Sequence, residues 1–499
     1  METLAQRLRH VLSLDPAAVA IEAEGRRWTW QDIACASALV EQVLRTAGTA
    51  ADAPVGWMAH NRATSVVSFV SLVMNGRMVV PLRPRQSATA LRTELETQRL
   101  EAVIAHADDW ASGSMAAAAR DTGSAGIALG DADGFSVTHV AGLEFVGAAD
   151  HRAPMPGFVM ERLTSGTTGP PKRVPVAEDV LLPALRAGEQ SGGTRTGGET
   201  APSKSPAILL KPFSHAGGLF GLLLALYQAR PMVLMDRFVP AQWAAVVQQY
   251  RPKAASLVPA MIRMILDEAI DPSMLGSLKA IRSGTAPLDP RMQVEFERRY
   301  GIPILVDYGA AEFIGGIAGW SLEDHRRFGE TKRGSVGRLR RDVELRLTSP
   351  LTGEDAQEGA VGVVNLRSPR FGDGWHRTSD LARIDGDGFL FLEGRVDDAI
   401  NRGGFKIMPE EVVKALLQFP GVREAVVVGL PDARLGEVPV AAVQLATDKV
   451  PPEPSILEHH LRQHLAPYMI PVAFQFPAEL PRTASMKIDR PAVRALFAE

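Results

Sequence analysis

A run of small, hydroxylated and glycine residues is the segment of this 499-residue chain best suited to chemistry. It reads Leu163-Thr164-Ser165-Gly166-Thr167-Thr168-Gly169-Pro170-Pro171-Lys172 and follows the apolar run 157–160. Glycine permits close ligand approach that a Cβ would block. Backbone N–H groups in such a segment form a nest for anions, and the hydroxyls add donors. The segment therefore predicts a mobile loop that wraps phosphates, with an ordinary surface turn as the alternative.

This segment differs from the P-loop of kinases and GTPases, which requires the pattern G-x-x-x-x-G-K-[ST]. Gly166 and Gly169 are too close together for that pattern, prolines intervene, and Arg173 follows Lys172. The phosphate chemistry predicted here therefore belongs to another class of nucleotide-binding protein.

The bulk composition is that of a globular protein, with 46% apolar and 22% charged residues. A net charge of −3 provides no field that gathers nucleic acid. The single cysteine, Cys35, excludes an internal disulfide framework and a cysteine-built zinc site. The first 16 residues do not have the pattern of a signal peptide, and the apolar run 66–74 is too short to span a bilayer. We therefore expect a soluble, cytoplasmic protein.

Short apolar segments alternate with amphipathic ones along most of the chain, which predicts parallel sheets covered by helices on both faces. The helix at 29–46 is expected to turn Asp32 and Glu41 to water. Residues 191–205 read as an exposed, mobile linker. We predict strands at 55–58, 78–82, 102–105, 208–210, 232–235, 256–258, 279–282 and 304–306, and helices at 29–46, 65–74, 91–100, 219–227, 241–250, 261–269 and 290–300.

Ligands of such sheets bind beyond the carboxyl ends of the strands, so we expect chemistry at 212–218, 283–288 and 307–312. Residues 330–387 change to glycine-punctuated β segments, which indicates a small β subdomain. The last hundred residues, with helices predicted at 409–417 and 455–466, form a plausible separate α+β lobe.

Five segments in order resemble the ANL superfamily of adenylate-forming enzymes, which includes acyl- and aryl-CoA ligases, peptide-synthetase adenylation domains and luciferases. They are LTSGTTGPPK, DYGAAE (307–312), WHRTSDL (375–381), GRVDDAINRGGFKI (394–407) and PRTASMKIDR (481–490). The resemblance covers the chain from Trp30 to the C-terminus. It implies an α/β fold: a large N-terminal domain of βα-type sheets with a small β subdomain (1–396), and a smaller, mobile α+β domain (397–499) that carries the catalytic lysine.

The resemblance also implies where ATP, Mg²⁺ and CoA bind. Tyr308 would stack on adenine, Asp380 would accept the ribose hydroxyls, and Arg395 would contact ribose and phosphate. The glycine pair 403–404 would line the thiol channel or form only a tight turn, and Lys406 would meet a CoA phosphate or be solvated. The full predicted set for ATP and CoA is Thr164, Ser165, Gly166, Thr167, Thr168, Gly169, Lys172, Gly284, Thr285, Ala286, Asp307, Tyr308, Gly309, Ala310, Ala311, Asp380, Arg395, Gly403, Gly404 and Lys406.

The catalytic residues implied by the resemblance are Lys487, Glu312 and Thr168. Lys487 would reach the carboxylate and the α-phosphate, where a fixed cation in a dry site lowers the barrier between two anions. Glu312 would ligate Mg²⁺, a hard cation that prefers oxygen. Asp397 would be the hinge about which the small lobe rotates between the two half-reactions.

The acid would lie near Phe213, His215, Gly284, Gly309, Gly315 and Gly316. The glycines and the apolar lining favour an aromatic or medium-chain acid. An amino acid is disfavoured, because Asp236 is the first acidic residue after Pro212. His215 has no acidic neighbour in sequence, so we expect packing rather than a catalytic triad.

The chain departs from the family pattern at Arg173, Ala311, Ser379 and Met486, of which the first, third and fourth replace glycine and Ala311 replaces threonine. These changes leave room for a slower or specialised enzyme. The predicted function is an ATP-dependent carboxylate–CoA ligase, with a stand-alone enzyme that loads a carrier protein and a nucleotide-binding pseudoenzyme as alternatives. The expected partners are the acid, ATP and CoA, with a carrier protein as the alternative acceptor, and the chain is a monomer or homodimer.

Overall fold

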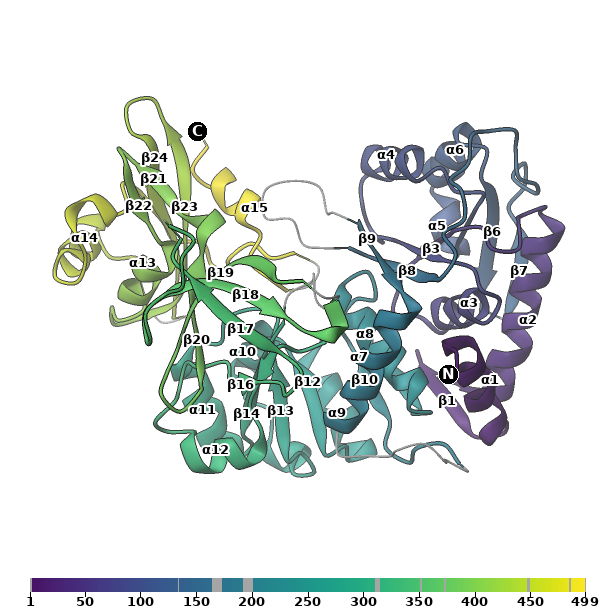
Figure 1. Ribbon diagram of the computed structural model, residues 1–499, viewed down its shortest axis with the longest axis horizontal. Helices are drawn as coiled ribbons and strands as arrows, with labels where there is room; N and C mark the ends of the chain where they lie inside the picture. Colours follow the sequence, from purple (N-terminus) through teal and green to yellow (C-terminus); the bar gives the residue numbers. More distant parts are fainter. Residues whose placement is uncertain are drawn as a thin grey trace. The chain divides into compact units, whose positions relative to one another are not determined.

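The computed structural model of the chain describes residues 2–132, 134–163, 173–191, 201–309, 315–350, 352–371, 374–446, 449–483 and 486–498. It has the mixed α/β architecture that the alternating pattern predicts (Figure 1). Two compact units form: Met1–Ala255 with Met264–Ala280 and Gly309–Gly315, and Ser256–Arg263 with Ile281–Tyr308 and Gly316–Glu499. The second unit contains both the β subdomain and the predicted C-terminal domain. The predicted boundary after residue 396 stays a prediction.

The first unit contains a seven-stranded sheet with the order β7-β6-β5-β3-β4-β8-β9. Its inner strands are parallel, whereas β7 and β9 pair antiparallel at the two edges. The strands are β3 (Val55–Met58), β4 (Val79–Leu82), β5 (Ala102–His106), β6 (Ala125–Gly130), β7 (Ser136–His139), β8 (Phe158–Leu163) and β9 (Arg173–Ala177).

Helices cover both faces of this sheet because successive strand residues point to opposite sides. Val79 packs in the core cluster that contains α2 (Trp30–Thr46) and α3 (Ala63–Met74). The next residue, Val80, packs in another cluster with residues from α4 (Ala88–Gln98), α5 (Ala107–Ala111) and α6 (Ser114–Asp121).

A four-stranded sheet of the same unit has the order β10-β11-β1-β2. The first three strands are parallel, and β1 and β2 form an antiparallel pair. The strands are β1 (Val19–Ala23), β2 (Arg26–Thr29), β10 (Ala207–Leu209) and β11 (Met232–Leu234), and the helices along this part of the chain are α1 (Leu4–Leu14), α7 (Glu178–Ser191), α8 (Ala216–Tyr227) and α9 (Pro240–Tyr250).

A five-stranded sheet follows the order β12-β13-β14-β15-β16, and the β subdomain is an antiparallel sheet with the order β17-β18-β19-β20. The bounds are β12 (Ala254–Leu257), β13 (Ala280–Ser283), β14 (Ile304–Tyr308), β15 (Ala318–Gly319), β16 (Arg338–Leu339), β17 (Glu344–Thr348), β18 (Gly362–Arg367), β19 (His376–Ile384) and β20 (Leu390–Arg395), with helices α10 (Pro259–Asp267), α11 (Pro290–Tyr300) and α12 (Leu322–Phe328).

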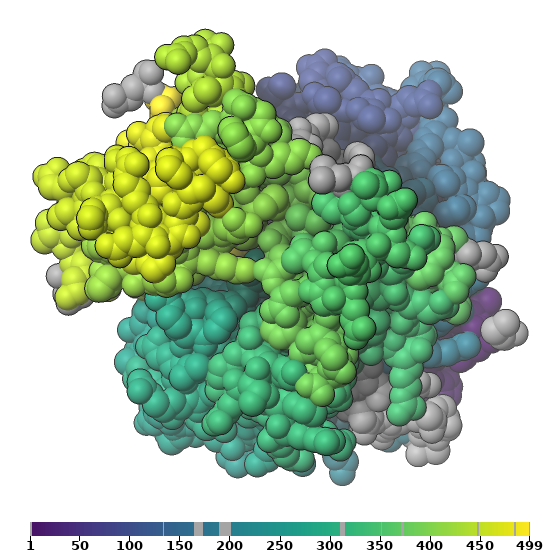
Figure 2. All heavy atoms as spheres, turned by 60° about the vertical axis from the view of Figure 1, so that its left-hand side comes forward, coloured from purple at the N-terminus to yellow at the C-terminus, as the bar shows by residue number. Residues whose placement is uncertain are grey.

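The C-terminal segments form a sheet with the order β22-β21-β24-β23, to which β25 adds beside β24. The last helix, α15, packs on β23 and lies at the surface (yellow in Figure 2). The elements are β21 (Ile400–Arg402), β22 (Phe405–Ile407), β23 (Val422–Asp432), β24 (Gly436–Leu445), β25 (Phe474–Gln475), α13 (Pro409–Leu416), α14 (Pro454–Arg462) and α15 (Arg490–Ala495).

Several sequence predictions need correction. Glu41 does not face water: it is 7% exposed and pairs with the buried Arg77 at 2.8 Å. The helix predicted at 455–466 ends at Arg462. The sheets are not purely parallel, because antiparallel strands close their edges. Most of the predicted linker 191–205 lies outside the described residues. No helix among the residues searched is long and apolar enough to cross a membrane.

Candidate active site

The predicted phosphate loop lies outside the described residues, which stop at Leu163 and resume at Arg173. Its predicted ligands Thr164, Ser165, Gly166, Thr167, Thr168, Gly169 and Lys172 therefore remain predictions. The two flanking residues are paired across β8 and β9, in antiparallel register.

Arg173, which stands where the family has glycine, is a structural cation at the start of β9. Its guanidinium pairs with Glu161 at 3.0 Å and with Glu94 of α4, and it donates to the carbonyl of Pro81 at 3.1 Å. Glu161 also pairs with Arg152 at 2.6 Å and has a side chain only 3% exposed. Arg173 therefore links β9 to β8, β4 and α4.

Four of the predicted residues form one connected polar network in the second unit. Tyr308, the last residue of β14, donates its hydroxyl to Asp380 Oδ2 at 2.5 Å. Asp380 and Arg395 are paired neighbours on β19 and β20, and Arg395 Nη1 lies 3.3 Å from Asp380 Oδ1. Arg395 also donates through Nε and Nη2 to the two oxygens of Asp397, both at 2.9 Å. The structure thus brings together the residues predicted for adenine, ribose and phosphate with the predicted hinge.

Electrostatics favour the charged forms of Arg395 and Asp397. The bidentate bond from Arg395 is the main reason that the pKa of Asp397 is lowered, and the Ser379 hydroxyl adds a further hydrogen bond. The same pairing, opposed by burial, raises the pKa of Arg395. Ser379 is a second departure from glycine, and its hydroxyl helps to stabilise the carboxylate of Asp397, the predicted hinge residue.

The carboxyl ends of β13 and β14 are shaped by close backbone contacts. A Cβ on Gly284 would lie 2.7 Å from the carbonyl oxygen of Asp307, so only glycine fits. Thr285 has a φ of 73°, which is strained for a β-branched residue. The Asp307 carboxylate pairs with Arg340 at 2.6 Å and with Arg282 at 3.1 Å. Its side chain is therefore part of the scaffold, and its predicted contact with nucleotide is untested.

The predicted residues Ala310, Ala311 and Glu312 lie outside the described residues, whereas Gly309, Gly315 and Gly316 lie inside them. Gly315 has a φ of 86°. Among the described side chains, no group of three or more histidines, cysteines or acids is placed to hold a metal ion. The predicted role of Glu312 as the magnesium ligand stays a prediction.

Buried contacts hold the predicted acid-binding segment after β10 in place. Phe213 is fully buried and stacks on Trp57 with ring centroids 6.4 Å apart, and His215 precedes the first turn of α8. A Cβ on Gly218 would lie 2.1 Å from the carbonyl oxygen of Pro212. Phe213 therefore supports this segment as a core residue, and its contact with substrate stays a prediction, as does that of His215.

Asn61 is a positioning residue that the sequence analysis missed. Its side chain is 6% exposed. The amide nitrogen donates to the carbonyls of Lys211 at 3.1 Å and Met235 at 3.3 Å, and Oδ1 accepts from Phe213 N at 3.0 Å. Asn61 thus ties the carboxyl end of β3 to those of β10 and β11. The available signal was a polar residue three positions beyond the end of a buried strand.

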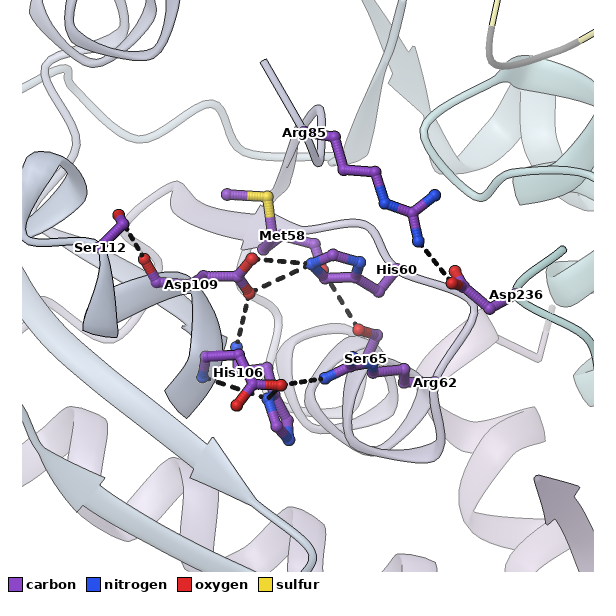
Figure 3. Close-up of polar contacts among 10 residues, drawn as sticks. Met58, His60, Arg62, Ser65, Arg85, His106, Asp109, Ser112 and Asp236 are labelled. Carbon is purple, nitrogen blue, oxygen red and sulfur yellow. Dashed lines mark hydrogen bonds and ion pairs between the residues drawn. The ribbon is translucent and has the colours of Figure 1, made fainter. Parts of the chain in front are cut away.

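Ion pairs lie at the same ends of the strands, among them those of His60 and Arg85 (Figure 3). His60 Nε2 lies 2.9 Å from Asp109, and Arg62 pairs with Asp108 at 3.0 Å. Arg85, after β4, pairs with Asp236, after β11, at 2.5 Å. The first acid after Pro212 is therefore already neutralised by an arginine.

Lys487 lies in a tight turn of the C-terminal segment. Its carbonyl accepts from Thr483 N at 2.8 Å, and Met486 N donates to Thr483 O at 2.9 Å. Met486 has a φ of 64°, a region that favours glycine, which explains why the family has glycine there.

The glycine pair forms the turn of a hairpin. Gly403 and Gly404 have φ angles of 57° and 88° and connect β21 to β22. Positive φ at both central residues is what a two-residue hairpin requires. The turn alone accounts for both glycines, so the thiol channel stays a prediction. Lys406 is exposed.

A family model described as AMP-binding enzyme matches residues 8–375, and one described as AMP-binding enzyme C-terminal domain matches residues 411–487. The chain therefore belongs to the AMP-binding enzyme family. This match confirms the predicted ANL superfamily, and with the named relatives it confirms the enzyme class of AMP-forming acid–thiol ligases.

The chain is 31% identical over 386 residues to the indoleacetate–CoA ligase of Aromatoleum aromaticum, covering 72% of each chain. It is 30% identical over 362 residues to a medium/long-chain-fatty-acid–CoA ligase of Mycobacterium tuberculosis, covering 67% of this chain and 61% of that relative. ATP-bound MatB from Rhodopseudomonas palustris has the same fold, with a TM-score of 0.83, 22% identity and coverage of 100% and 99%.

The ion pair at the hinge makes a pH-dependent contribution to stability. Because the pKa of Asp397 is lowered on folding, its contribution is present above the ordinary aspartate pKa and is lost as the pH falls through the lowered value. We predict that Asp397→Asn has a lower free energy of unfolding in urea than wild type. This difference in free energy should be constant near neutral pH and should become smaller below about pH 4. The exposed Asp52→Asn is the control, with no margin expected. A margin for Asp397→Asn that grows as the pH falls contradicts the assignment.

Proposed function

We propose that the chain is an ATP-dependent carboxylate–CoA ligase. A carboxylate oxygen attacks the α-phosphorus of ATP, which forms acyl-AMP and releases pyrophosphate. The sulfur of CoA then attacks the acyl carbon, the thiol proton is lost, and AMP leaves. The observation that carries the proposal is the network of Tyr308, Asp380, Arg395 and Asp397, because it joins three predicted nucleotide residues to the predicted hinge.

In this account the nucleotide lies along that network. Asp380 accepts from Tyr308 and pairs with Arg395, and a carboxylate is an acceptor of the kind that a pair of ribose hydroxyls requires. The Arg395 guanidinium supplies further donors for phosphate oxygens, where charge-assisted bonds are strong. Stacking of the Tyr308 ring on the base stays a prediction, because the residue is 7% exposed in the structure.

Lys487 stabilises the adenylation transition state. When the acid and the triphosphate approach, negative charges crowd together, and a positioned ammonium group offsets them at low dielectric. Mg²⁺, when bound, screens the phosphates, and the protein needs to supply only Glu312, because this ion takes its other ligands from phosphate oxygens and waters. Thr168 and the rest of the loop 164–172 would hold the β- and γ-phosphates.

The acceptor is the least constrained part of the proposal. Free CoA is favoured because the relatives are named acid–CoA ligases. A carrier-protein phosphopantetheine presents the same thiol and is the second candidate. A pseudoenzyme is disfavoured because Lys487, Asp380 and Arg395 are all present, and the last two are bonded to each other.

We propose an aromatic or medium-chain acid as the substrate. The relatives named above include ligases for indoleacetate and for medium- or long-chain fatty acids. An amino acid is disfavoured, because Asp236, the first acidic residue after Pro212 in the sequence, is paired with Arg85 at 2.5 Å.

The direct test is pyrophosphate release across a panel of carboxylic acids, with and without CoA. We expect release that depends on an aromatic or medium-chain acid, and thioester only after CoA is added. Turnover that requires a carrier protein favours the second candidate. Binding of ATP with no release for any acid, with or without a carrier protein, contradicts the proposal.

Replacing Lys487 separates the two half-reactions. We predict that Lys487→Ala slows adenylation by at least about 100-fold, because a charge-stabilising group at the reacting oxygens is lost. Thioester formation from pre-made acyl-AMP should change by less than about threefold, since that step no longer joins two anions. Rapid-quench assays of each half-reaction measure both rates. The matched control is Lys279→Ala, at an exposed lysine of the first unit. Equal loss of both steps argues against the two-pose mechanism.

A further inference from the structure

An ion cluster beside the hinge is not used by the reaction as described above. It consists of Asp398, Glu410 and Arg490. Arg490 Nη2 lies 3.1 Å from Asp398 Oδ2 and 3.6 Å from Glu410 Oε1. The Asp398 side chain is 9% exposed. The Glu410 side chain is 29% exposed, so one guanidinium pairs with a buried carboxylate and with a partly buried one.

The three residues come from separate parts of the second unit. Asp398 closes the 3₁₀ turn Val396–Asp398 that contains the hinge residue, and Glu410 is in the first turn of α13. Arg490 is the first residue of α15, three positions after Lys487. The cluster thus joins the chain that carries the catalytic lysine to the chain that follows the hinge.

Backbone bonds make the connection from Arg490 to Lys487 short and ordered. Asp489 caps α15 by accepting from Ala492 N at 3.1 Å, and its own N–H donates to Pro481 O at 2.9 Å. On the other side of the lysine, Thr483 N donates to Lys487 O at 2.8 Å. The position of α15 therefore sets the position of the lysine turn.

The carboxylates depend on the arginine. Burial raises the pKa of both Asp398 and Glu410, and the buried Glu410 Oε2 has no hydrogen-bond partner among the described residues. A Cβ on Gly394 would lie 2.8 Å from that oxygen, so Glu410 packs directly on the strand that leads into the hinge. Removing the guanidinium leaves buried negative charge without its ion-pair partner, which is strongly unfavourable.

We propose that Arg490 is a positioning residue for Lys487. Its ion pairs with Asp398 and Glu410 hold the turn that contains Lys487 next to the predicted hinge segment, so that the lysine moves together with that segment. The inference rests on the proposed function, because it assigns Lys487 to adenylation. A displacement of about 1 Å at a reacting group is enough to cost about 100-fold in rate. The thioester step does not use the lysine and should not depend on the cluster.

The test compares the half-reactions in Arg490→Ala, Arg490→Lys and Arg494→Ala. Arg494 is the control on the same helix: it donates to Gly429 O at 3.2 Å, and its charge acts on Asp398 more weakly than that of Arg490. We expect Arg490→Ala to lower kcat for adenylation by about 10- to 100-fold with KM for ATP nearly unchanged, and to spare thioester formation from pre-made acyl-AMP. Arg490→Lys should recover part of the loss, because it keeps the charge but not the fork geometry.

Hydrogen exchange gives a readout that does not depend on the activity. The amides of Met486 and Asp489 should exchange about tenfold faster in Arg490→Ala and in Asp398→Asn than in wild type or Arg494→Ala, because their bonds to Thr483 and Pro481 open more often. Unchanged exchange, or equal loss of both half-reactions, overturns the proposal. If wild type adenylates no acid, the proposed function fails, while the exchange rates still decide whether Arg490 orders the turn.

Discussion

The guanidinium of Arg395, held between two carboxylates, is the interaction on which the rest of this account depends. It binds Asp397 through two nitrogens and Asp380 through the third. A bidentate arginine–carboxylate pair fixes direction as well as distance. The residue that is proposed to hold the ribose and the residue that is proposed to act as the hinge are therefore not independent. The charge on one arginine pairs with both carboxylates, which links the proposed ribose residue to the proposed hinge residue.

The first unit supports its loops in a different way, by using backbone carbonyls and buried pairs. The single side-chain amide of Asn61 hydrogen-bonds to backbone groups of the chain after β10 and after β11. Arg173 and Glu161 form a nearly dry pair at the base of the predicted phosphate loop. Buried ionic groups are weak sources of net stability, but removing one partner is expensive. Such pairs suit the role of fixing where a loop begins and ends.

The sequence predicted the regular elements well where periodicity is strong. The helix at 290–300 has the predicted bounds, and β3 does as well. Periodicity failed where a partner far away in the sequence determines burial. The helical pattern predicts that Glu41 faces water, but its ion pair with Arg77, 36 residues away, places it in the core. The structure connects Tyr308, Asp380, Arg395 and Asp397, which the motifs singled out, and their roles stay predictions. The motifs gave no sign of Asn61, whose hydrogen-bond partners lie 150 or more residues away. They also did not reveal that Arg173 pairs with Glu94 or that Ser379 hydrogen-bonds to Asp397.

The claim that the nucleotide lies on the Arg395 network is tested most directly by the affinity for ATP, measured by titration calorimetry in Arg395→Met and Arg383→Met. Both arginines lie on the same sheet and pair with an acid, but Arg383 pairs with Glu393, outside the network. The account predicts that Arg395→Met weakens binding by at least about tenfold, as expected for loss of a charge-assisted bond, and that Arg383→Met leaves it unchanged. Equal affinity in the two variants would contradict it.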